Sequence, residues 1–106
     1  MFSEVSVDEL AGLMTGQIHL VDVREQDEYE DGHVRGALFA PLSALPDMVD
    51  RFRSDVTNYV ICKSGGRSAR ACEWLASQGY DTVNVAGGTS AWRLSGRDVV
   101  AGDQPA

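Results

Sequence analysis

The chain has 106 residues, of which 43% are hydrophobic and 24% are charged, and its formal net charge is -7. A chain of this length forms about one domain, and this composition is that of a folded globular protein rather than a disordered one. The negative charge opposes binding to nucleic acid or anionic lipid, and no run of about 20 apolar residues could span a membrane.

The cysteine count and the N-terminus narrow the class of protein further. Two cysteines are too few for a disulfide framework or a four-ligand zinc site. The first residues, 1–4, include an acid before any apolar run and lack the basic start and cleavage site of a secretory signal. We therefore expect a cytoplasmic protein without metal or cofactor, in which a cysteine would matter as a reactive thiol.

The first half of the chain alternates between helix and strand signals. Ser6 and Glu9 form a predicted capping box at the start of a helix, and residues 18–21 are a short β-branched run typical of a buried strand. The acidic segment 25–31 is predicted to form a short exposed helix that Gly32 ends, and residues 36–40 another strand.

The second half repeats the alternation after an irregular segment. Residues 42–52 are expected to form one or two irregular helical turns, because Pro46 interrupts any longer helix. Residues 59–62 are the clearest apolar strand, and the polar turn after it leads into a helix over residues 67–78. A strand at 82–85 and a last helix that begins at Gly87 and Gly88 complete the pattern.

This order of elements predicts an α/β fold. Strands that alternate with helices favour a single domain with a largely parallel central sheet of about five strands and helices on both faces. We place the domain over residues 1–100 and expect the short tail 101–106 to be frayed.

Cys62 lies where such a sheet binds its ligands, at the carboxyl end of the strongest strand and just before a helix. The glycines Gly65 and Gly66 allow the following turn to point successive backbone N–H groups inward. These groups, the helix dipole, Lys63 and Arg67 all favour a thiolate, so the pattern predicts an ionised, nucleophilic Cys62. Cys72, on the apolar face of the next helix, is expected to be a packed core thiol.

Four segments of the chain resemble those of rhodanese domains. Residues Cys62–Ser68 resemble the active-site loop of that family, with the nucleophilic cysteine first and an arginine closing a six-residue loop. The other matching segments, in order along the chain, are Val21–Arg24, Gly32–Ala37 and Gly87–Trp92. The resemblance extends from the first predicted helix to Trp92.

The resemblance implies a thiosulfate sulfurtransferase in which Cys62 carries a sulfur atom as a persulfide. The partners that it implies are a small anionic sulfur donor such as thiosulfate and an acceptor such as cyanide or a thiol, with a sulfur-relay protein as a further candidate. We take Cys62 as the catalytic residue. The candidate substrate-binding residues are Lys63, Ser64, Gly65, Gly66, Arg67, Ser68 and Arg24.

Three other polar residues have more than one interpretation. Arg24 ends a strand at the same sheet edge as Cys62, where it could face the pocket or form a salt bridge to Glu28. We expect Asp22 to be a structural hydrogen-bond acceptor, because an ionised thiol needs no base. His33 is expected to fix a turn rather than to act in catalysis.

Two other functions are compatible with the pattern. Related phosphatases and arsenate reductases resemble a Cys-x-x-x-x-x-Arg loop, which is one residue longer than the segment from Cys62 to Arg67 and would suit a tetrahedral oxyanion. A noncatalytic binding or regulatory module of the same fold is the second alternative. The retention of Cys62 and both loop cations favours sulfur transfer.

Overall fold

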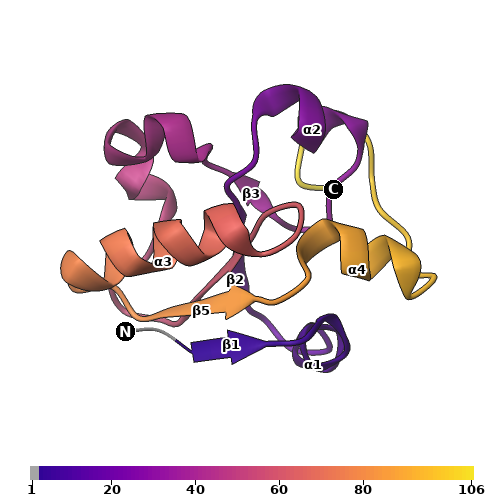
Figure 1. Ribbon diagram of the computed structural model, residues 1–106, viewed down its shortest axis with the longest axis horizontal. Coiled ribbons are helices and arrows are strands. Elements are labelled where there is room, and N and C mark those ends of the chain that lie inside the picture. Colours follow the sequence, from indigo (N-terminus) through magenta and orange to yellow (C-terminus); the bar gives the residue numbers. More distant parts are fainter. Residues whose placement is uncertain (1–2) are drawn as a thin grey trace.

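The computed structural model describes residues 3–106; Met1 and Phe2, which belong to the segment used to predict cytoplasmic location, lie outside the described residues. Five strands form one sheet in the order β1-β5-β4-β2-β3, and all neighbouring pairs are parallel (Figure 1). The strands are β1 Ser3–Val5, β2 His19–Asp22, β3 Leu38–Phe39, β4 Asn58–Ile61 and β5 Thr82–Val85. The predicted parallel sheet is confirmed.

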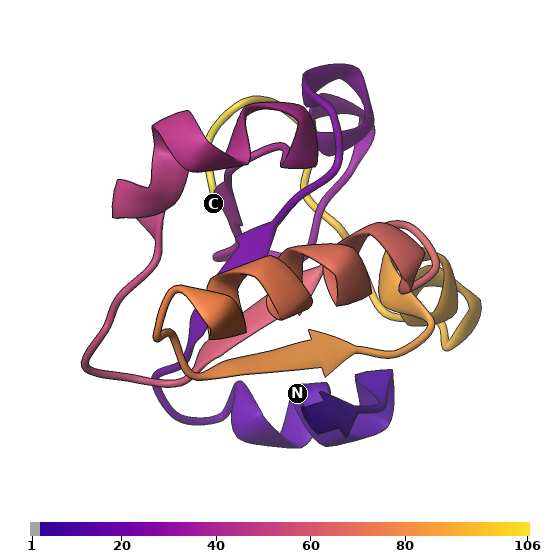
Figure 2. The same cartoon turned by 60° about the vertical axis from the view of Figure 1, so that its left-hand side comes forward.

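Helices cover both faces of this sheet. They are α1 Val7–Leu13, α2 Gln26–Asp31, α3 Gly66–Ser77 and α4 Gly88–Leu94, and a 3₁₀ segment spans Leu42–Arg51. Figure 2 shows α3 and α1 on opposite sides of the sheet. Two apolar clusters result, one under α3 and the 3₁₀ segment and the other against α1 and α4. No helix among residues 3–106 has the length and apolar character needed to cross a bilayer.

Local sequence signals set several of these boundaries. Ser6 Oγ accepts a hydrogen bond from Glu9 N at 3.1 Å, and Glu9 Oε1 accepts one from Ser6 N at 2.9 Å, so the predicted capping box starts α1. The 3₁₀ segment is broken at Ala44 and Met48, on either side of Pro46, as expected for irregular turns.

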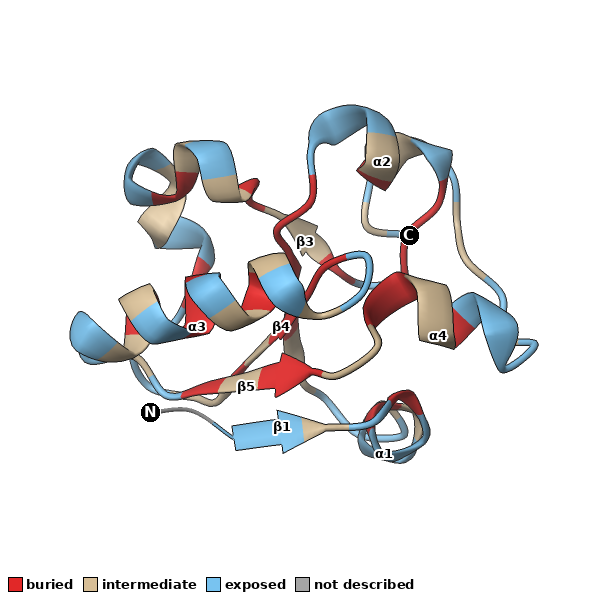
Figure 3. Ribbon diagram, in the orientation of Figure 1, coloured by how far each residue is buried: buried red, intermediate tan, exposed pale blue. Residues whose placement is uncertain are grey.

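Strand β1 was absent from the predicted elements. Ser3 and Glu4 are exposed in it, so this edge strand carries no apolar alternation that a sequence could reveal (Figure 3). The central strands differ, because they are buried on both faces: Val21, Val60 and Ile61 have no exposed surface.

The C-terminal segment, predicted to be frayed, lies against α2 and the chain that follows it. Gly102 N donates to Glu30 O, and Gly36 N donates to Pro105 O, both at 2.8 Å. The ring of His33 is fully buried, with Nδ1 at 2.8 Å from Tyr29 O and Nε2 at 2.8 Å from Gln104 O. His33 therefore fixes both the turn and the tail, as its predicted structural role requires; composition alone did not reveal the partners that order the tail.

Candidate active site

Cys62 follows β4 directly and lies beside the first turn of α3, at the carboxyl edge of the sheet. Its side chain is buried, with 1% of the residue exposed. Gly65 has φ +109°, a left-handed conformation that residues with a Cβ rarely adopt, and this lets the chain turn sharply into α3. The predicted cysteine turn is therefore present in the structure.

Hydrogen-bond donors converge on the sulfur of Cys62. Gly65 N donates to Cys62 Sγ across 3.1 Å, and Ser68 Oγ donates to it across 3.2 Å. Burial raises the pKa of Cys62, but hydrogen bonds from Ser68 Oγ and from the N–H groups of Ser68, Gly65 and Ser64 outweigh it, so the pKa lies below its ordinary value. The turn thus stabilises the thiolate form.

The start of α4 fixes the other side of the loop. Thr89 N and Thr89 Oγ1 both donate to Cys62 O, at 2.8 and 3.1 Å, and Ser90 N donates to Lys63 O at 2.9 Å. A Cβ at Gly88 would lie 2.4 Å from Cys62 O, so only glycine permits this approach. The Gly87–Trp92 segment therefore holds the cysteine backbone in place.

Lys63 and Ser64 are exposed at the tip of the loop, whereas Ser68 is fully buried beside the sulfur. A cavity of about 240 Å³ lies next to this tip. Its walls come from the segment after β2, from α2, from the loop and from α4, and are formed by Arg24, Glu28, Asp31, Lys63, Thr89, Ser90 and Arg93. This mixed-charge cavity includes Lys63 of the cysteine loop in its wall.

Arg67 points toward α2. Its Nη1 and Nη2 donate to Glu28 Oε1 and Oε2 at 2.6 and 2.8 Å, a bidentate ion pair in which both side chains are about 30% exposed (32% and 29%). The hydrogen bond from Arg67 holds the pKa of Glu28 at about 2, against the opposing effect of burial and with the help of the bond from Glu25 N. Glu28 is therefore an anion beside the loop at any physiological pH.

Arg24 is buried and pairs with Asp22 rather than with Glu28. Its Nη2 lies 2.8 Å from Asp22 Oδ2 and also donates to Gly32 O at 2.8 Å. Asp22 Oδ1 accepts further bonds from Arg24 N and Nε. Asp22 is thus a structural acceptor, as predicted, while Arg24 is one of the residues that line the cavity.

Cys72 lies in the core cluster under α3 and has no exposed surface. Burial raises the pKa of Cys72 to about 11, so its thiol remains protonated. The prediction of a packed core cysteine is confirmed, and the two thiols of the chain differ in the direction of their pKa shifts.

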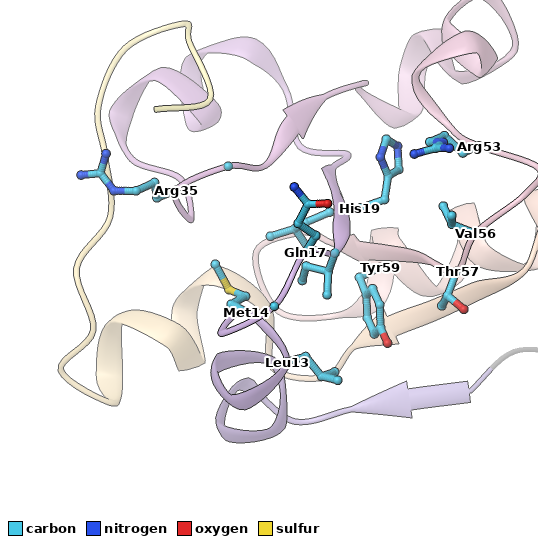
Figure 4. A pocket seen from close by; sticks show the side chains of 13 residues that line it. Leu13, Met14, Gln17, His19, Arg35, Arg53, Val56, Thr57 and Tyr59 are labelled. Atoms are coloured by element: carbon cyan, nitrogen blue, oxygen red, sulfur yellow. The ribbon is translucent and has the colours of Figure 1, made fainter.

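A larger cavity lies at the amino ends of the strands, opposite the cysteine loop. It measures about 700 Å³ and is lined by residues at the amino ends of β2 and β4, among them His19 and Tyr59, together with Leu13 and Met14 near the end of α1 (Figure 4). None of its lining residues belongs to the cysteine loop. Cavity size therefore does not by itself indicate the cysteine loop.

Three contacts of the site were not anticipated from the sequence. The sequence suggests Glu28 only as a partner for Arg24, and it indicates no role for Thr89 or Asn84. Asn84 Nδ2 donates to Gly65 O at 3.3 Å and to Glu4 Oε2 at 2.8 Å. The charge of Glu28, opposite the loop cations, was the one usable signal; the other two contacts depend on tertiary packing.

Comparisons with known proteins agree with this geometry. The model of the rhodanese-like domain matches residues 6–95. The chain is 34% identical over 104 residues to a sulfurtransferase of Allochromatium vinosum, covering 95% of this chain and 97% of that one. It is 37% identical over 76 residues to the putative sulfurtransferase YtwF of Bacillus subtilis, covering 72% and 74%.

A solved structure has the same fold. The rhodanese-like domain protein of Staphylococcus aureus superposes with a TM-score of 0.82 at 33% identity, covering 86% of this chain and 91% of that one. The order of the strands, the cysteine turn and these matches lead to one conclusion: the chain belongs to the rhodanese-like domain family.

Proposed function

We propose that this protein is a sulfurtransferase that moves a sulfane sulfur from thiosulfate to cyanide or a thiol through a persulfide on Cys62. The Cys62 thiolate attacks the outer sulfur of thiosulfate, the S–S bond of the donor breaks, and sulfite leaves with the bonding electron pair. Cyanide then attacks the outer sulfur of the persulfide, so that thiocyanate leaves and the Cys62 thiolate is regenerated. Neither step requires an oxidant or a cofactor.

The observation that carries this proposal is the convergence of donors on one sulfur. Gly65 N and Ser68 Oγ contact Cys62 Sγ at 3.1 and 3.2 Å, and the pKa of this thiol is lowered despite its burial. A thiolate is the nucleophilic form of cysteine, and the same N–H groups can hold the negative charge of a persulfide. The sulfurtransferase names of the relatives support the same chemistry.

The loop residues have separate tasks in this proposal. Lys63, exposed at the cavity, attracts the anionic donor, and the N–H groups of Ser64, Gly65 and Ser68 hold the sulfur. Gly66 begins α3, and Arg67 ties its first turn to α2 through Glu28. Arg24, paired with Asp22, contributes its charge from the cavity wall.

The engagement of Arg67 also weighs against a phosphatase or arsenate reductase. A loop that binds a tetrahedral oxyanion uses its arginine for bidentate contacts to the anion, whereas both terminal nitrogens of Arg67 here bind Glu28. Sulfur transfer needs only one sulfur atom in the turn. Failure to hydrolyse a phosphotyrosine analogue is therefore the expected result.

Steady-state kinetics test the proposal. Thiocyanate production from thiosulfate and cyanide should show ping-pong behaviour, with parallel lines in double-reciprocal plots, because sulfite leaves before the acceptor reacts. The C62S variant should be inactive, while C72S, which changes the core thiol alone, should retain activity if it folds. Absence of thiocyanate from the folded wild-type protein would favour a noncatalytic module instead.

A further inference from the structure

Few of the charges around the cysteine loop are free. Arg67 is bound to Glu28, Arg24 to Asp22, and Arg93 Nη2 faces Asp31 Oδ2 at 3.3 Å. Among residues 3–106, no ion pair includes Lys63. Together these side chains leave a single positive charge in excess at the site, and the Cys62 thiolate balances it.

Glu28 is the acid in this set that is held closest to the loop arginine. Its two carboxylate oxygens bind Arg67, and Oε1 also accepts a hydrogen bond from Glu25 N at 3.1 Å as part of the capping of α2. The carboxylate is thus fixed from both sides, and Glu28 forms part of the wall of the 240 Å³ cavity together with Lys63. An incoming donor in that cavity would therefore meet a permanent negative charge next to the loop.

The charge of the donor then decides how strongly it is attracted. Thiosulfate is a dianion, whereas an alkanethiosulfonate offers the same outer sulfur on a monoanion and releases a sulfinate in place of sulfite. The Glu28 carboxylate repels each negative charge on the donor, so the dianion loses more binding free energy than the monoanion. Discrimination by placing a repulsive group is a common route to specificity.

We propose that Glu28 is a specificity-determining residue of this site, which disfavours dianionic sulfur donors relative to monoanionic donors with the same reactive sulfur. This inference rests on the proposed sulfurtransferase function. In this role the Glu28–Arg67 pair does more than hold α2 to α3, because the carboxylate offsets the positive charge at the cysteine loop. The preferred donors of the protein are then sulfane sulfur compounds that carry a single negative charge.

A double-mutant cycle of Glu28 and Arg67 tests the proposal. Thiosulfate and methanethiosulfonate serve as the two donors, and cyanide serves as the acceptor. The ratio of the two kcat/KM values should rise by about fivefold in favour of thiosulfate in E28Q, because one repulsive charge is lost. R67Q should lower the ratio, and E28Q/R67Q should leave it above the wild-type value but below that of E28Q, because Glu28 lines the cavity and Arg67 is not among its lining residues. E30Q, which removes a carboxylate bound to Gln26 on the same helix, should leave the ratio unchanged.

A second measurement follows the same variants without turnover. The pH midpoint of Cys62 alkylation should move down in E28Q, where the Arg67 charge is uncompensated, and up in R67Q. If the ion pair only held α2 against α3, each variant would lower kcat/KM by the same factor for both donors, and the ratio would stay constant. Should E28Q fail to fold, R67Q and the double variant still make opposite predictions for the ratio.

The measurements distinguish an error in the proposed function from an error in the inference about Glu28. If the folded wild-type protein takes sulfur from neither donor, the proposed function is overturned and the inference about Glu28 falls with it. If both donors are used and the ratio does not rise in E28Q, or does not exceed the wild-type value in the double variant, the inference alone is overturned.

Discussion

Ser68 Oγ donates a hydrogen bond to Cys62 Sγ across 3.2 Å, and this contact joins the end of β4 to the first turn of α3. The hydroxyl is fully buried and is also 3.2 Å from Gly65 O, so its rotation is restricted to a few positions. A neutral donor in this place favours the thiolate without adding a charge that would repel or trap the leaving group.

Replacing Ser68 should therefore make Cys62 a weaker acid. In S68A the largest effect that lowers the pKa of Cys62 is lost while the opposing burial remains, so the pH midpoint of its alkylation should move upward. The rate of iodoacetamide labelling as a function of pH measures this midpoint. S77A, the same change at the far end of α3, is the control and should not move it; an unchanged midpoint in S68A would contradict the assigned role.

Glu28 should make the protein sensitive to acid. The pKa of Glu28 is about 2 in the folded protein against an ordinary value of 4.5, so between these values the unfolded chain binds more protons. The stability that Glu28 contributes is thus fully present above about pH 4.5 and is lost as the pH falls toward 2. With allowance for solvent screening, this contribution is no more than about 2 kcal/mol.

Urea unfolding at several pH values measures that loss. E28Q should be less stable than the wild type at pH 7, and the difference between the two free energies of unfolding should shrink as the pH is lowered from about 5 to 3. E30Q serves as the control for a carboxylate on the same helix. A difference that stays constant with pH would mean that Glu28 does not titrate as its ion pair requires.

Gly88 should tolerate no side chain. A Cβ there would lie 2.4 Å from Cys62 O and 2.6 Å from Lys63 O, and both are backbone atoms that cannot rotate away. G88A should cost about 2–4 kcal/mol of stability or displace the loop, with loss of the low alkylation midpoint. G96A is the control for backbone strain without steric overlap. Gly96 also has a positive φ, but no atom lies within 4 Å of the Cβ that the substitution would add. Equal losses in the two variants would argue against the close approach.

His33 and the C-terminal segment should unfold as one unit. H33F keeps a flat ring against Tyr29, whose centroid lies 3.7 Å away, but loses the contacts to Tyr29 O and Gln104 O, at a cost of about 1–3 kcal/mol. Deletion of residues 101–106 should also lower the midpoint of thermal unfolding. The two losses should be less than additive, because the Gln104 contact is shared; full additivity would show that tail and ring act separately.

The sequence was sufficient for most of the fold and for the centre of the site, for reasons that differ between elements. Strands β2 and β4 contain short apolar runs with the fully buried Val21, Val60 and Ile61, and the cysteine turn is marked by adjacent glycines, so local chemistry specifies both. Strand β1 escaped prediction because an exposed edge strand needs only its neighbour β5, which is distant in the sequence.

The partners of Arg24 and Arg67 could not be predicted from the sequence, because they too depend on how distant segments pack together. Arg24 and Arg67 both had acids within reach, and the choice between Asp22 and Glu28 depends on where α2 packs against the loop. The docked tail likewise depends on buried carbonyl contacts to His33, which composition cannot show.

The most direct test of the central claim is the intact mass of the protein after brief incubation with thiosulfate and removal of the donor. The account predicts an added mass of one sulfur atom, located on the peptide that contains Cys62, absent in C62S and lost when cyanide is added. A folded wild-type protein that gains no sulfur, or one whose added sulfur lies on Cys72, would contradict it.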